Sequence, residues 1–294
     1  MGIRNSNLKI LELNYPKVKF VQRGNQLSIF GEDELLNIIE AKIVSLVEHL
    51  EKYNSLNENN IYNILGKTKE EMLFESKGDE VLVFGNKGLN VKARTLNQRK
   101  MVDIIDQNDM MFAIGPAGTG KTYTAVALAV RALKNKEVRK IILTRPAVEA
   151  GENLGFLPGD LKEKLDPYLQ PLYDGLRDMI PSEKLEEYLE SGTIQIAPLA
   201  FMRGRTLDNA FVILDEGQNA TESQMKMFLT RMGKSAKFII TGDVSQIDLP
   251  KNQKSGLVKA QDILQNVEGI GFVFLDAQDV VRHKLVKKII KAFE

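Results

Sequence analysis

A glycine-rich run that ends in lysine and threonine carries the clearest chemical signal in the sequence. It follows the apolar run MMFAI directly, precedes an alanine-rich helical stretch, and fits the pattern G-x-x-x-x-G-K-[ST]. Glycines in such a loop let backbone N–H groups turn inward around phosphates, and the helix N-terminus adds partial positive charge. The pattern predicts a phosphate-binding loop in which Lys121 reaches the β- and γ-phosphates and Thr122 holds Mg²⁺. The loop comprises Gly115, Pro116, Ala117, Gly118, Thr119, Gly120, Lys121 and Thr122.

Two adjacent acids follow the apolar run AFVIL. Because ligands of open α/β sheets bind at the carboxyl ends of the strands, we expect Asp215 to hold the Mg²⁺ of the nucleotide and Glu216 to polarise the attacking water. Adjacent acids after a strand are also common as a helix cap and first turn, so this assignment depends on the phosphate-binding loop. A water-activating carboxylate favours hydrolysis over phosphoryl transfer, which disfavours a small-molecule kinase.

A third polar group follows the apolar run KFIITGD, where Gly242 and Asp243 are succeeded by Gln246. An amide at the end of a strand beside the first two motifs can sense the γ-phosphate and convert hydrolysis into a backbone shift. Asp243 has an alternative role as the cap of a following helix. We therefore predict a sensor role for Gln246.

The elements that must position these groups begin at about residue 95. Short apolar runs there alternate with longer helical stretches, which is typical of a parallel sheet buried on both faces. The sequence thus predicts a doubly wound α/β core. The expected strands are MMFAIG, KIILTRP, TIQIAP, AFVILDE, KFIITGD and GFVFL.

The N-terminal part has a different pattern. Residues 17–23 alternate roughly between apolar and polar, Gly24 and Asn25 supply a two-residue turn, and QLSIFGE follows as a second strand. An amphipathic helix comes next, and a further helix is expected at 6–13. This ββα order is similar to the later half of a KH-type RNA-binding module, although it lacks the G-x-x-G loop. A small docking or oligomerisation domain is the alternative.

The change of pattern along the chain also predicts domain boundaries. Residues 51–80 are polar and Asn-rich with one short helix, and EVLVFGNKGLNVKART then offers two short strands. We expect three segments: a small α+β, KH-like domain at 1–52, a connector with a β-hairpin at 53–94, and the α/β domain at 95–294.

Composition limits the remaining classes of function. The 294 residues include 40 Lys and Arg against 39 Asp and Glu, so the net charge of +1 gives no global argument for a polyanion partner. There is no cysteine and there are two histidines, which excludes disulfides, thiolate catalysis and Cys-ligated metals. No run of about 18 apolar residues and no signal peptide occurs, so we expect a cytoplasmic protein without a membrane partner.

The motifs together resemble a known family. Gln98, GPAGTGKT, DEGQN and TGDVSQIDLP look like the core of superfamily 1 helicases, and jointly they look like the PhoH-like ATPases over about residues 95–294. The resemblance implies a RecA-like P-loop NTPase core, ATP and Mg²⁺ as cofactors and, by analogy with helicases, a link to RNA. The partners that we expect are single-stranded RNA and a ribonuclease or other RNA-processing protein. Gln98 would contact the adenine edge, and Gly217 stands where the family pattern favours alanine. The site residues keep their roles: Lys121, Thr122, Asp215, Glu216 and Gln246.

The sequence departs from the helicases in length. Residues 251–294 are too few to form a second motor lobe, so no opposing surface carries an arginine to the γ-phosphate. Such arginines contribute about 10³–10⁵ in rate. Head-to-tail contacts that close a homo-oligomeric ring would supply one, and the candidates are Arg282, Arg205 and Arg203. We thus expect an ATPase that remodels RNA as a ring; the alternative is an ATP-dependent switch or scaffold that touches no nucleic acid.

Overall fold

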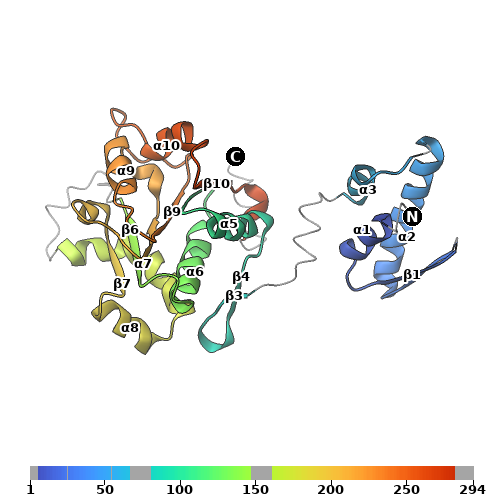
Figure 1. The fold of residues 1–294 in the computed structure, drawn as a ribbon, viewed down its shortest axis with the longest axis horizontal. Helices are drawn as coiled ribbons and strands as arrows, with labels where there is room; N and C mark the ends of the chain where they lie inside the picture. Colours follow the sequence, from blue (N-terminus) through green and yellow to red (C-terminus); the bar gives the residue numbers. More distant parts are fainter. Residues whose placement is uncertain (1–5, 25, 54, 67–80, 147–160, 282–294) are drawn as a thin grey trace. The chain divides into compact units, whose positions relative to one another are not determined.

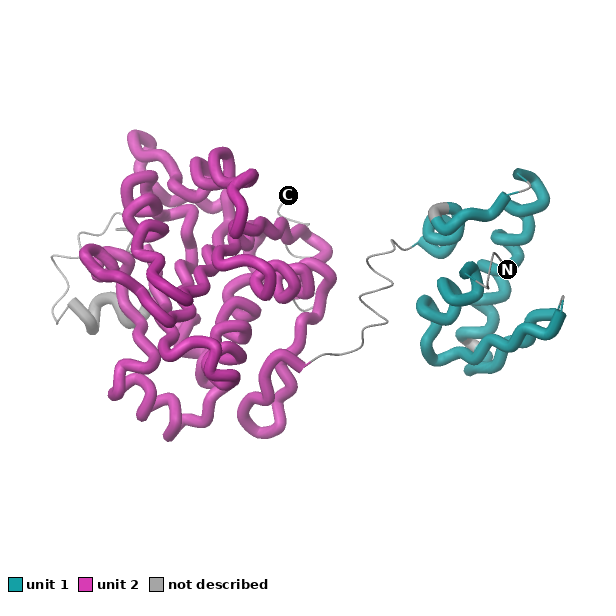
Figure 2. The backbone as a smooth tube through the Cα atoms, in the orientation of Figure 1, with its two compact units in different colours: residues 1–80 teal, residues 81–294 magenta. Residues whose placement is uncertain are grey.

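The computed structural model describes residues 6–24, 26–53, 55–66, 81–146 and 161–281. The chain divides into two compact units, Met1–Glu80 and Val81–Glu294 (Figure 2). The element order along both units is shown in Figure 1. Among the described residues, none of the helices is both long and apolar enough to span a membrane.

The first unit packs three helices and a hairpin around a small core. Strands β1 (Lys19–Arg23) and β2 (Gln26–Phe30) pair antiparallel, and the Arg23↔Gln26 register leaves the expected two-residue turn. The helices are α1 (Ser6–Asn14), α2 (Asp33–Tyr53) and α3 (Glu58–Leu65). The core includes Leu8, Leu11, Phe20, Ile39, Leu46, Ile61 and Leu65.

Helix α3 changes the expected boundary of this unit. The sequence assigns residues from 53 onward to a connector, but Ile61 and Leu65 are buried in the core of the first unit. Asn57 and Asn60 form a reciprocal capping box that starts the helix, so the Asn-rich composition marks a helix start rather than a linker. The hairpin of β3 (Val81–Phe84) and β4 (Asn90–Lys92) lies within the second unit, where Val83 and Val91 join the larger core.

The second unit contains a six-stranded parallel sheet, as the apolar runs predict. The strands lie in the order β10-β5-β9-β8-β6-β7, and every pairing between neighbours is parallel. They comprise β5 (Met110–Ile114), β6 (Lys140–Arg145), β7 (Ile194–Pro198), β8 (Ala210–Leu214), β9 (Lys237–Gly242) and β10 (Ile270–Phe274). The predicted RecA-like P-loop core is therefore confirmed.

Helices cover both faces of this sheet, because successive strand residues point to opposite faces. Met111 and Ala113 of β5 belong to the core beneath one set of helices, whereas Phe112 and Ile114 belong to the core on the other face. The first face is covered by α5 (Leu96–Gln107), α6 (Lys121–Lys134), α7 (Leu161–Met179) and α8 (Ser182–Glu190). The second is covered by α9 (Glu222–Leu229) and α10 (Gly256–Leu264).

The strand order decides which loops meet. Strands β5, β9, β8 and β6 are successive neighbours, so the chain segments that leave their carboxyl ends lie side by side. These segments begin at residues 115, 243, 215 and 146. Three of them are the motifs singled out in the sequence, and the fourth follows Arg145.

Candidate nucleotide site

The phosphate-binding loop joins β5 to α6 with glycines where other residues would be strained. Gly118 and Gly120 have φ values of +82° and +77°. A side chain on Gly120 would also approach the Gln98 amide nitrogen to 2.7 Å. Helix α6 begins directly afterwards at Lys121, so its unsatisfied N–H groups and partial positive charge face the loop. This is the geometry that binds phosphate.

Lys121 folds back across the loop. Its Nζ donates to the carbonyl oxygens of Gly115 at 2.7 Å and Pro116 at 2.8 Å, and the residue is 8% exposed. Burial lowers the pKa of Lys121, while the nearby carboxylates of Asp243 and Glu216 oppose the shift. The ammonium is thus partly desolvated and flanked by acids, which prepares it to exchange carbonyl oxygens for phosphate oxygens.

Asp215 directly follows the buried strand β8 and accepts hydrogen bonds from two hydroxyl groups. Thr122 and Thr241 both donate to its Oδ1 at 2.6 Å, and the residue is 1% exposed. The Thr122 hydroxyl and the Asp215 carboxylate are hard oxygen ligands that meet at one edge of the cavity, and Mg²⁺ is bound by one or two protein oxygens together with phosphates. The residues present therefore fit Mg²⁺.

Arg145 is a part of the site that sequence reasoning missed. It stands at the end of β6 and donates from Nε to Asp215 Oδ2 at 2.8 Å and from a terminal nitrogen to Glu216 Oε1 at 3.1 Å. Its side chain is 18% exposed. Two signals were available, its place at a strand end and the stretch TRPAVEAG from Thr144 onward, which also resembles the PhoH-like ATPases, but neither of them assigns a role to Arg145.

Glu216 is turned toward the cavity by an unusual backbone conformation. Its φ of +55° and ψ of +39° lie in the left-handed region, which residues other than glycine rarely adopt. Its Oε2 accepts Gln218 Nε2 at 2.6 Å, and Gln218 also donates to the Gln246 carbonyl oxygen at 3.2 Å. Gln218 is 1% exposed, so this amide joins the acids of β8 to the loop after β9.

Asp243 ties that loop to the phosphate-binding loop. Its Oδ2 accepts the Ala117 backbone N–H at 3.1 Å and Gln246 Nε2 at 2.7 Å. Its Oδ1 accepts the Ser245 backbone N–H and hydroxyl. Burial raises the pKa of Asp243, but the Ser245 and Gln246 hydrogen bonds and the Lys121 charge outweigh it, so the net pKa is lowered. In the described chain the next helix is α10, which begins at 256, so Asp243 caps a turn rather than a helix.

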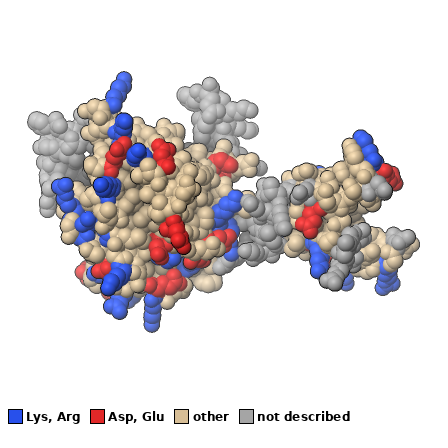
Figure 3. Space-filling view, turned by 45° about the horizontal axis from the view of Figure 1, so that its top comes forward, with Lys and Arg blue, Asp and Glu red and all other residues tan. Residues whose placement is uncertain are grey.

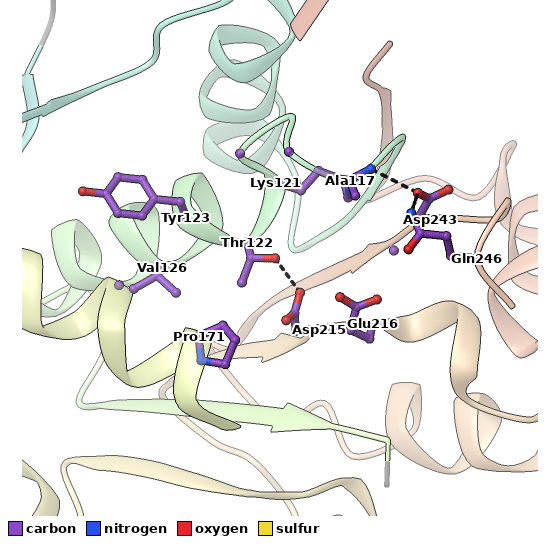
Figure 4. A pocket seen from close by; sticks show the side chains of 14 residues that line it. Ala117, Lys121, Thr122, Tyr123, Val126, Pro171, Asp215, Glu216, Asp243 and Gln246 are labelled. Carbon is purple, nitrogen blue, oxygen red and sulfur yellow. Dashed lines mark hydrogen bonds between the residues drawn. The ribbon is translucent and has the colours of Figure 1, made fainter. Parts of the chain in front are cut away.

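These groups surround one cavity of about 300 Å³ (Figure 4). Figure 4 shows Asp215 and Glu216 together on one side, with Thr122 facing Asp215 and Ala117 bonded to Asp243. Helix α7 adds Pro171 and Gly175 to the lining. The three motifs that the sequence places at strand ends thus meet in one pocket, and all of Lys121, Thr122, Asp215, Glu216 and Gln246 line it.

Gln98 lies in a neighbouring cavity of about 320 Å³. Its Nε2 donates to the Thr119 carbonyl oxygen at 2.9 Å, and its Oε1 accepts the Arg94 backbone N–H at 2.8 Å. Gly118, Gly120 and Tyr123 line both cavities, and residues of the β3–β4 hairpin complete the second one. Burial and Asp178 raise the pKa of Tyr123 to about 12. Because the two cavities share these lining residues, the second cavity is placed to receive the rest of a nucleotide whose phosphates lie in the first.

The candidate arginines for a shared site differ in their surroundings. Arg205 donates to Gln195 Oε1 at 2.7 Å, whereas the side chain of Arg203 is exposed. Arg282 lies outside the described residues. Arg145 places a guanidinium beside the acids from within the same lobe, although it is not one of the lining residues.

A parallel sheet with a glycine-rich loop, a buried aspartate and the loop after β9 around one pocket defines a nucleotide-binding P-loop NTPase. A family model described as PhoH-like protein matches residues 90–294, and the chain belongs to this family. A PhoH-like protein of Bacillus subtilis (strain 168) is 52% identical over 295 residues, which cover 100% of this chain and 92% of that protein. The predicted family resemblance is confirmed.

Other relatives match different shares of the chain. Protein PhoH of Escherichia coli (strain K12) is 44% identical over 205 residues, which cover 69% of this chain and 58% of that protein. Among solved structures, the UvsW helicase from bacteriophage T4 aligns with 88% of this chain and 99% of its own at 11% identity and a TM-score of 0.40.

Proposed function

We propose that this PhoH-like protein hydrolyses ATP with Mg²⁺ and couples the reaction to remodelling of single-stranded RNA or a ribonucleoprotein. The observation that carries the hydrolysis is the placement of Glu216 directly beside Asp215 in the same cavity. Asp215 and Thr122 would hold Mg²⁺, which supplies charge neutralisation for the phosphates when bound. Glu216 orients the attacking water and accepts its proton. Lys121 binds the phosphate oxygens, and Gln246 senses the γ-phosphate.

The second cavity supports adenine as the base. Gln98 uses one hydrogen of Nε2 and one lone pair of Oε1 for backbone groups, so the amide retains a further donor and acceptor position. An amide with both positions pairs with adenine N6 and N7. We therefore propose that the Gln98 amide contacts the adenine base.

Nucleotide binding is tested by thermal unfolding with and without Mg-ATP. A ligand at 100 times its Kd adds about 2.7 kcal/mol to the free energy of unfolding, so wild type should melt at a higher temperature with Mg-ATP. Lys121→Ala should lose the shift, whereas Glu216→Gln should keep it and lose turnover, because the amide preserves shape but not basicity. An unshifted wild type contradicts the nucleotide site, and unchanged turnover in Glu216→Gln removes Glu216 from its role.

The proposed link to RNA is supported by the resemblance of the motifs to superfamily 1 helicases, not by charge. On the face in Figure 3, basic and acidic side chains are interspersed, so this face offers no broad basic patch among the described residues. ATP turnover should rise when single-stranded RNA is added and less so with single-stranded DNA. If neither changes turnover, the function reduces to an ATP-dependent switch or scaffold for a protein partner, such as a ribonuclease. A cytoplasmic location stays a prediction of the sequence.

The described residues contain one motor lobe, and we propose that a neighbouring subunit of a homo-oligomeric ring completes its site. If a neighbouring subunit completes the site, specific activity should rise with protein concentration. Mixing Arg282→Ala with Lys121→Ala protein should then restore activity, because some interfaces pair an intact loop with an intact arginine. A mixture no more active than the sum of its parts rejects Arg282, and the same test applies to Arg205 and Arg203.

A further inference from the structure

The carboxylate of Glu216 is held by a different side chain on each oxygen. Arg145 donates to Oε1 at 3.1 Å, and Gln218 donates to Oε2 at 2.6 Å. The Glu216 side chain is 44% exposed, so solvent alone would leave its three side-chain torsions free to vary. The two contacts therefore select one orientation of the group that must face the attacking water.

Arg145 takes its own orientation from Asp215. Its Nε donates to Asp215 Oδ2 at 2.8 Å, while the other oxygen of Asp215 is already bonded by Thr122 and Thr241. A guanidinium is a rigid planar fork, so fixing Nε on one carboxylate also fixes the direction of the terminal nitrogens. One of these then meets Glu216. The buried Asp215 thus fixes the orientation of Arg145, and Arg145 in turn fixes that of the half-exposed Glu216.

A purely structural role accounts poorly for this contact. Strands β6 and β8 are already paired from Lys140↔Ala210 to Thr144↔Leu214, so the sheet does not need the ion pair to bring them together. Glu216 also has the left-handed backbone described above, which persists only where surrounding contacts determine it. Such conformations gather at functional sites.

We propose that Arg145 is a positioning residue for hydrolysis, which aligns Glu216 with the attacking water by way of Asp215. The inference rests on the proposed ATPase function. Arg145 acts through the two acids, since both line the cavity and Arg145 does not. It thus differs from an arginine that reaches the γ-phosphate from a neighbouring subunit.

The test compares Arg145→Met and Arg145→Lys with wild type in steady-state ATP turnover and in binding of a fluorescent ATP analogue. Loss of a positioning partner typically costs about 10- to 100-fold, so Arg145→Met should lower kcat by that factor. KM and nucleotide affinity should stay near wild type, because the phosphate-binding loop is untouched. Arg145→Lys should fall between, since an ammonium keeps the charge but lacks the fork that spans both acids.

Arg131→Met is the matched control. Arg131 has a 19% exposed side chain, also pairs with a carboxylate, that of Asp106, and is not among the residues lining either cavity. Its turnover should equal that of wild type. A wild-type kcat in Arg145→Met, or a raised one, overturns the inference, because a raised kcat would mean that Arg145 restrains the base.

A second comparison separates action through Glu216 from an independent effect. Single-turnover hydrolysis should be slow in Glu216→Gln, and the rate should be nearly the same when Arg145→Met is added to it. The full decrease in that background would overturn the inference.

A crystal structure of Arg145→Met gives a readout that does not depend on turnover. Asp215 should keep its bonds to Thr122 and Thr241, while the Glu216 carboxylate should move. If the Glu216 carboxylate does not move, the positioning role is refuted, whatever the turnover of wild type. If wild type does not hydrolyse ATP, it is the proposed function that is refuted.

Discussion

Replacing Asp243 with asparagine should loosen the phosphate-binding loop and destabilise the second unit. Asp243 is 6% exposed, and each carboxylate oxygen accepts two donors. An asparagine turns one oxygen into an NH₂ group, so either orientation leaves a backbone N–H, that of Ala117 or of Ser245, facing another donor. Hydrogen bonds to charged groups contribute about 1.5–3 kcal/mol. We therefore expect Asp243→Asn to lower the free energy of unfolding by about 2–3 kcal/mol at pH 7.

The effect should shrink in acid. The net pKa of Asp243 is lowered in the folded protein, so its contribution is fully present above the unfolded pKa, about 3.9, and is lost as pH falls through the folded pKa. A protonated aspartic acid carries an O–H donor on one oxygen and an acceptor on the other, so it resembles asparagine, whose NH₂ group likewise replaces one acceptor with donors. The variant and wild type should therefore approach equal stability at the lowest pH at which both remain folded.

Urea unfolding at several pH values measures this difference, and hydrogen exchange resolved to single residues by NMR follows the Ala117 amide. The matched control is Asp208→Asn, because Asp208 is exposed and its Oδ1 accepts the Lys234 backbone N–H at 2.7 Å. That change should cost at most about 1 kcal/mol. If Asp243→Asn costs no more than the control, or if Ala117 exchange is unchanged, the proposed tie between the two loops is refuted.

Three further substitutions test the packing and electrostatics around the site. Gly115→Ala places a Cβ 2.4 Å from the Leu275 carbonyl oxygen and should lower the free energy of unfolding, measured in urea, by about 1–3 kcal/mol; an unchanged midpoint would contradict the packing of the loop against Leu275, the residue after β10. Tyr123→Phe should remove one phenol whose titration near pH 12 is seen in absorbance at 295 nm. The raised pKa of Tyr123 contributes stability that is fully present below the unfolded pKa of about 10 and is lost as the pH rises toward 12. Wild type should therefore lose stability relative to the variant between about pH 10 and pH 12. Phe228→Ala should cost about 3–5 kcal/mol, since Phe228 is fully buried with its ring centroid 5.1 Å from that of Phe238, while Phe201→Ala, at a side chain 58% exposed, should change stability by less than about 0.5 kcal/mol.

The sheet was predictable because each strand carries its own signal. MMFAI and AFVIL are continuous apolar runs, and all five residues of each strand are buried, as a sheet covered on both faces requires. The residues of the phosphate-binding loop were equally predictable from the sequence, because the motif includes its flanking strand and helix. The sequence predicts a short helix at α3 but assigns it to the connector, since two buried residues, Ile61 and Leu65, give little periodicity in a polar segment.

Arg145 shows what a single sequence does not contain. Its partners lie 70 and 71 residues further along the chain, and they meet it only because β6 and β8 are neighbours in the sheet. Strand order is decided by packing among distant segments, so no local spacing could bring Thr144-Arg145-Pro146 to the acids at 215–216. Gln218 differs in that it lies two residues from Glu216, yet its bond to the Gln246 carbonyl oxygen also depends on β8 and β9 lying side by side. The groups proposed to bind the nucleotide can therefore be predicted from motifs, whereas strand order decides which groups hold the two acids in place.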